Sequence, residues 1–227
     1  MEDVDNPLAE SFTAAEYAAW DATLSGTTLP TLTNYFGDFE DTTPYGGVVG
    51  DVLGLDADGR LGVVITKEVN KQEVLGFVNF LDLTATSYCP MSNQAELFYS
   101  IAPDPDGLYA LGAKTKTQVA TMMPRLITHE VTHILQGTQS LFPTFSGWHA
   151  PWETEGGATL AEQLVGMAVL GHESGENLGK TEWLTGYHGD HWYRSWAQDL
   201  KSYFGLESIN SPEECTWLAR EEDNDGP

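Results

Sequence analysis

Apolar residues recur at helical spacing through residues 119–136 and predict an amphipathic helix there. Gly137 follows this stretch and is expected to end the helix in the left-handed conformation that glycine adopts readily. Pro124 lies inside the pattern, where it either opens the final turns of this helix or kinks a longer one. The positions that define the apolar face are Leu126, Ile127, Ile134 and Leu135.

A second helical pattern covers residues 155–170, and Gly171 is expected to stop it. A short helix near the N-terminus, at residues 10–20, and a later helix, at residues 192–204, complete the helical predictions. The apolar stripe of the second helix consists of Leu160, Leu164, Val165, Met167 and Ala168.

Residues that favour strands are concentrated between residues 46 and 101. A tight acidic turn separates the first two groups of these residues. We therefore expect an α+β fold, in which a twisted, mostly antiparallel sheet packs on the first predicted helix and a helical lobe follows. The predicted strands are 48–53, 61–66 and 95–101.

The chain is expected to form one domain, residues 1–220, because 227 residues can bury a sizeable core. Its sheet lobe would span residues 46–137 and its helical lobe residues 138–210. The acidic residues 221–227 are expected to form a disordered tail. No apolar run approaches the roughly 18 residues that a membrane-spanning helix needs, so no membrane span is predicted.

The charge of the chain restricts its partners. Asp and Glu number 34 against 10 Lys and Arg, which gives a net charge of −24. Such a charge excludes nucleic acid as a natural partner and disfavours anionic membranes. Because salt screens self-repulsion, a halophilic or marine source is a further hypothesis. The opening residues are acidic where a signal peptide is basic, so a secreted protein would be present here in a mature or truncated form.

The main candidate for chemistry is the run of residues 129–133, which reads H-E-x-x-H. Residues four apart share one face of a helix, so His129 and His133 can reach the same zinc ion. Glu130 is then placed to act as a general base on a water molecule at that ion. A catalytic zinc takes three protein ligands, and Glu155, in the first turn of the second predicted helix, is the best third candidate.

Two other carboxylates compete for a role near this site. Glu153 lies on a different face of the helix from Glu155, and Glu162 lies about 10 Å further along its axis. Neither can reach an ion that Glu155 holds. We expect Glu162 to orient a histidine N–H or to pair with a nearby cation, while an ordinary solvated carboxylate remains the alternative.

The pattern H-E-x-x-H, followed by a glutamate in the E-G-x-A setting of residues 155–158, resembles the gluzincins, the thermolysin-like zinc peptidases. The chain is most similar to the hyicolysin family of that group. Residues 76–83 read GFVNFLDL beside the family's G-Y-F-N-P-x-D-L, with Phe80 in place of the proline. Residues 92–99 read SNQAELFY beside its S-N-x-A-E-M, and residues 56–65 resemble its acidic turn and strand.

The resemblance implies a two-lobed zincin-like fold and a secreted, monomeric zinc endopeptidase that hydrolyses proteins or peptides. It implies that peptide substrate binds as an extra strand beside residues 95–101, which would then be a sheet edge, while an ordinary sheet strand is the alternative. It also implies a second donor for the oxyanion, for which His188 is the first candidate and Tyr187 and His191 are the next.

Two further sites are left open by the sequence. Asp56 and Asp58 resemble half of a calcium loop, although Ile65 stands where a full loop has glutamate, so a tight acidic turn is the alternative. Cys89 and Cys215 would form one disulfide in a secreted protein, or remain buried thiols.

A non-catalytic module is the alternative to an enzyme. It would keep the same fold, stabilised by zinc or calcium, and would serve binding or adhesion. The presence of Glu130 argues against this alternative, because a binding module does not need a general base.

Overall fold

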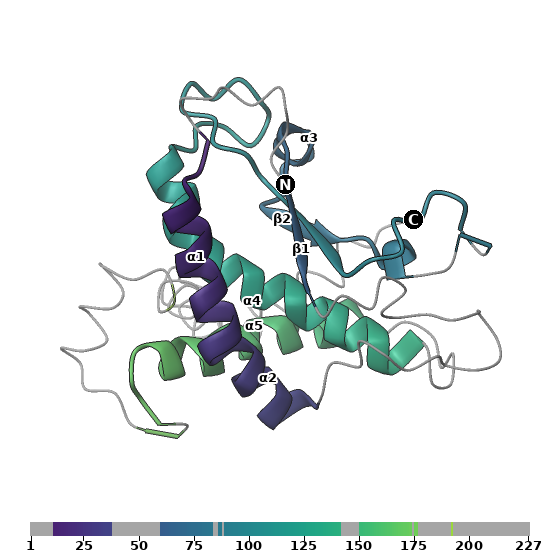
Figure 1. Cartoon of the computed structure of the whole chain (residues 1–227), viewed down its shortest axis with the longest axis vertical. Coiled ribbons are helices and arrows are strands. Elements are labelled where there is room, and N and C mark those ends of the chain that lie inside the picture. Colours follow the sequence, from purple (N-terminus) through teal and green to yellow (C-terminus); the bar gives the residue numbers. More distant parts are fainter. Residues whose placement is uncertain are drawn as a thin grey trace, which may run out of the picture. The chain divides into compact units, whose positions relative to one another are not determined.

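A computed structural model of the chain describes residues 11–37, 60–83, 86–87, 89–141, 150–173, 175–176 and 192. Two compact units, Met1–His149 and Ala150–Pro227, make up the chain. The described residues combine several helices with one small sheet, which confirms the α+β class (Figure 1). Within these residues, no helix has both the length and the apolar character needed to cross a membrane.

The first unit begins with a continuous helical stretch: α1 (Ala14–Thr23), a π-turn (Leu24–Thr28) and α2 (Leu29–Phe36). A capping box starts α1, because the Thr13 hydroxyl accepts from the N–H of Glu16 at 3.3 Å and the Glu16 carboxylate accepts from the N–H of Thr13 at 2.6 Å. The short helix predicted for residues 10–20 is therefore present, and it continues well past the predicted end.

Three short strands form the sheet: β1 (Gly62–Ile65), β2 (Gly76–Val78) and β3 (Leu97–Ser100). Their order is β1-β3-β2, with β1 parallel and β2 antiparallel to β3. The described sheet is thus mixed rather than mostly antiparallel, and the predicted strand 48–53 lies outside the described residues. The prediction that residues 95–101 form a sheet edge is wrong, because β3 is hydrogen-bonded on both sides.

Two connections hold the strands in place. Helix α3 (Lys67–Asn70) ends in Asn70, whose completely buried side chain accepts from the N–H of Ala102 at 2.9 Å and donates to its carbonyl at 3.0 Å. After β2 the chain makes a 3-10 turn, Phe80–Leu83. The Asn70 amide therefore continues the hydrogen-bonding pattern of the sheet just beyond β3.

The segments 76–83 and 92–99 meet at Asp82, which is 1% exposed. Its carboxylate accepts from Asn93 Nδ2 at 2.9 Å and from the Tyr99 hydroxyl at 2.7 Å. The Tyr99 ring stacks on Phe77, with centroids 5.0 Å apart. Burial and the neighbouring Asp82 carboxylate raise the pKa of Tyr99 to about 12. This network fixes the loop that leads into β3.

Helix α4 (Lys116–Leu141) packs against β2 and β3, and α1 runs beside its first half (Figure 1). The predicted apolar face is confirmed, since all four of its residues are buried. Pro124 lies inside a longer helix rather than at its start. The predicted end at Gly137 is wrong. A Cβ there would lie 2.5 Å from the Phe80 ring, so this glycine provides space for Phe80 within a continuing helix.

The second unit contains α5 (Pro151–Val169), which begins a few residues before the predicted start. Gly171 ends it as expected: its φ is +79°, and the N–H of His172 returns to the carbonyl of Met167 at 2.8 Å. The predicted apolar stripe is partly wrong, because Leu160 is 45% exposed and Ala168 is exposed. The buried face consists mainly of Ala158, Ala161, Glu162, Val165 and Met167.

Candidate metal centre

Helix α4 presents the two predicted histidine ligands on one face. The ring centroids of His129 and His133 lie 4.7 Å apart, and the ring planes are nearly perpendicular. His133 is 8% exposed, and its Nδ1 lies 3.0 Å from Gln136 Oε1. Because an amide oxygen can only accept, Nδ1 donates this bond and Nε2 keeps the lone pair that a metal requires. Gln136 is a partner that the sequence analysis did not identify.

Threonine hydroxyls flank the histidines on the buried side of α4. Thr132 is completely buried and donates to the carbonyl of Thr128 at 2.8 Å. Thr128 lies 3.3 Å, hydroxyl to hydroxyl, from Thr28 at the end of the π-turn. These threonine hydroxyls are therefore satisfied within the first unit, without using the histidine nitrogens.

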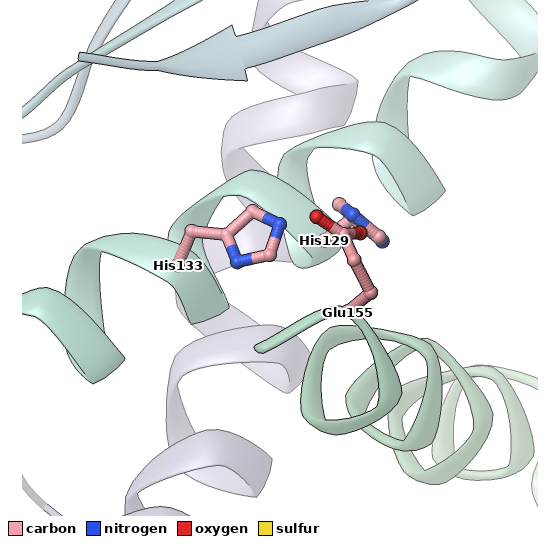
Figure 2. A group of neighbouring side chains, drawn as sticks. All are labelled: His129, His133 and Glu155. Carbon is pink, nitrogen blue, oxygen red and sulfur yellow. The ribbon is translucent and has the colours of Figure 1, made fainter. Parts of the chain in front are cut away.

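His129, His133 and Glu155 form a group that could hold a metal ion. Their ligand atoms all lie within 4.8 Å of one another, and Figure 2 shows the three side chains pointing toward one another. Two imidazoles and one carboxylate are a donor set that suits zinc at a catalytic site, where a fourth position stays open. The residues present thus fit the predicted metal, whose identity remains a prediction.

The other two glutamates of α5 have different surroundings. Glu153 is exposed, and its carboxylate accepts from the N–H of Ala150 at 3.2 Å, which caps the start of the helix. Glu162 is 4% exposed, so the alternative of a solvated carboxylate is wrong. That Glu162 orients a histidine or pairs with a cation stays a prediction.

The predicted general base, Glu130, is 4% exposed. Its Oε1 lies 3.2 Å from the position that a Cβ on Gly76 would occupy. The carboxylate therefore lies against the backbone of β2, on the side of α4 that faces the sheet. No signal in the sequence pointed directly to this contact, although Gly76 opens the segment 76–83 that resembles the family pattern.

Several predicted site residues lie outside the described residues. They include the candidate oxyanion donors and the candidate calcium ligands, and also the second cysteine of the predicted disulfide. These residues are His188, Tyr187, His191, Asp56, Asp58 and Cys215.

Comparisons with protein-family models, with curated proteins and with solved structures find no match to this chain. The resemblance to gluzincins therefore stays a prediction based on the motifs of the chain.

Proposed function

We propose that this chain is a zinc-dependent endopeptidase of the gluzincin type, most like the hyicolysins, in which His129, His133 and Glu155 hold the ion. The observation that carries the proposal is the convergence of these three side chains, with ligand atoms within 4.8 Å of one another. The donor set supports zinc, and the H-E-x-x-H spacing supplies a glutamate next to the first ligand.

The chemistry of peptide hydrolysis assigns a role to each of these residues. Bound zinc would supply Lewis acidity, which polarises a carbonyl and lowers the pKa of water toward neutrality. Glu130 takes a proton from the attacking water at its carboxylate and later delivers it to the leaving amine nitrogen. Its burial excludes competing solvent from this transfer. Gln136 keeps the His133 ring in one tautomer and orientation.

The substrate class and setting are part of the same proposal. A net charge of −24 favours basic or neutral peptides over acidic ones. The enzyme would act outside the cell as a monomer, and His188 would donate a hydrogen bond to the oxyanion.

Metal content and hydrolysis of casein, measured together, test the proposal. The wild-type chain is expected to contain one zinc and to cleave casein. Glu130→Gln keeps the size of the side chain but removes the base, so it should retain zinc and lose activity. His133→Ala should lose both zinc and activity.

The results separate the enzyme from its alternative. Zinc in both the wild type and Glu130→Gln, with no hydrolysis by either, would favour the non-catalytic binding module. A chain that binds no zinc would overturn the proposal. Calcium-dependent melting without any bound zinc would favour a calcium-stabilised module.

A further inference from the structure

Gly76 opens β2 at the place where the sheet meets α4, and it is crowded from three directions. A Cβ on this residue would lie 3.0 Å from the carbonyl oxygen of Tyr99, 3.2 Å from Oε1 of Glu130 and 3.3 Å from Cδ1 of Leu126. All three distances are shorter than the roughly 3.5–4.0 Å of ordinary contact between heavy atoms. A side chain at position 76 would therefore have to displace a neighbour.

The backbone does not explain the glycine. Gly76 pairs with Ser100 in the antiparallel ladder and lacks the positive φ that only glycine adopts readily. Among the described glycines, those with positive φ are Gly37, Gly107, Gly112, Gly171 and Gly175. The requirement at Gly76 is consequently one of space.

Of the three neighbours, Glu130 is the one that can move at least cost. The carbonyl of Tyr99 belongs to β3, which is hydrogen-bonded to a strand on each side. Leu126 belongs to the buried apolar face of α4, and its side chain has one torsion angle fewer than that of Glu130. The glutamate side chain can instead change its torsion angles. A methyl group at position 76 is therefore expected to push the carboxylate of Glu130 away from β2.

We propose that Gly76 is a positioning residue for Glu130, and that its missing side chain determines where the carboxylate lies relative to the two histidines on α4. The catalytic role of this positioning rests on the proposed function. The contact between position 76 and Glu130 does not depend on that function. A displacement of about 1 Å in a reacting group can cost roughly 100-fold in rate, so a single methyl group is enough to matter.

A double-mutant cycle on thermal unfolding tests the geometry without any activity. Gly76→Ala is expected to lower the melting temperature of the wild type. In a Glu130→Ala background one of the three crowding neighbours is absent, while the carbonyl of Tyr99 and the side chain of Leu126 remain, so the fall should be measurably smaller. Equal falls in the two backgrounds would show that Glu130 does not define the space at position 76, which would overturn the proposal.

Gly62→Ala is the matched control. Gly62 opens the other strand that flanks β3, and a Cβ there would meet the Leu97 side chain rather than Glu130. Its effect on melting should be the same with and without the Glu130 side chain. A similar dependence of both glycine variants on Glu130 would indicate a general effect on the sheet and would also overturn the proposal.

Kinetics of the zinc-loaded enzyme test the catalytic consequence. Gly76→Ala should retain one zinc and nearly the wild-type KM, while kcat falls about 100-fold. Gly62→Ala should keep kcat. Unchanged kcat in Gly76→Ala, or a loss confined to KM, would contradict a positioning role. If the wild type itself is inactive, the proposed function fails, and the unfolding cycle still decides the geometric claim.

Discussion

The indole N–H of Trp20 donates to the carbonyl oxygen of Ala120 at 3.3 Å, across the contact between α1 and α4. In an uninterrupted helix this carbonyl would accept from the N–H four residues later. That residue is Pro124, which has no N–H, so the helix cannot satisfy the carbonyl in the usual way. Trp20 therefore supplies a donor that Pro124 lacks, and it fixes α1 against α4 about two and a half turns before His129, the first candidate metal ligand.

Trp20→Phe is expected to destabilise the first unit by about 1–3 kcal/mol, because it leaves a carbonyl without this donor. In a Pro124→Ala background the restored N–H can bond to Ala120, so the same replacement should cost less. Urea unfolding of the four proteins in this cycle measures the difference. Identical costs in both backgrounds would show that the two residues are not linked through Ala120.

Gly137→Ala should destabilise the protein although alanine favours helices by about 1 kcal/mol over glycine. The new methyl group would lie 2.5 Å from the ring of Phe80, and such overpacking typically costs about 1–3 kcal/mol. In a Phe80→Ala background the clash is absent, so Gly137→Ala should become stabilising. Chemical denaturation checks this change of sign, and a stabilising effect in the wild type would contradict it.

Tyr99 is expected to make stability sensitive to alkaline pH. Its pKa rises from 10.0 in the unfolded chain to about 12 in the folded one, because burial and Asp82 disfavour the phenolate. The folded state therefore binds the Tyr99 proton more tightly than the unfolded state does. The contribution of this proton to the free energy of unfolding is complete below pH 10.0 and is lost as pH rises toward about 12. Unfolding free energies measured over this range should fall less steeply in Tyr99→Phe than in the wild type.

Glu155 and Glu153 provide a matched pair for the metal site. Glu155→Gln should lower zinc affinity by more than the roughly 10–100-fold typical of losing an outer partner, because it removes a proposed ligand. Glu153→Gln removes a nearby charge from the same helix turn but should leave affinity almost unchanged, since that carboxylate caps α5. Competition with a chromophoric chelator measures the zinc affinity of both variants. Equal losses would indicate that only the local charge matters.

The net charge of −24 predicts that stability depends on salt. At low ionic strength the acidic residues repel one another over long distances, and at about 1 M salt the screening length falls to roughly 3 Å. The melting temperature should therefore rise as potassium chloride is added. A melting temperature independent of salt would count against adaptation to a saline environment.

The sequence was sufficient to predict those features that depend on local patterns. The face of α4 that carries Leu126 and Ile134 follows from helical spacing, and the pairing of His129 with His133 follows from the motif. Both depend on residues a few positions apart in one element. The stop at Gly171 was also predictable, because a left-handed glycine ends a helix locally.

The features that could not be predicted depend on contacts distant in sequence. Gly137 and Gly171 both follow an apolar helical pattern and both were predicted to end a helix. The ring of Phe80 instead requires Gly137 inside a continuing helix. The composition of β3 fits an edge strand and a central strand equally well. Only its pairing with both β1 and β2 shows that it is central. The space that Gly76 leaves for Glu130 belongs to this class, because neither residue indicates the other in a single sequence.

The side chain of Asn70 makes the end of the sheet depend on the chemical integrity of a single amide. Asparagine is among the thermolabile residues, and its deamidation replaces the amide nitrogen with oxygen. At Asn70 that nitrogen donates to the carbonyl of Ala102, so after the reaction two oxygens would face each other in a completely buried position. A change of one atom at Asn70 would thus turn a hydrogen bond at the end of the sheet into a repulsive contact.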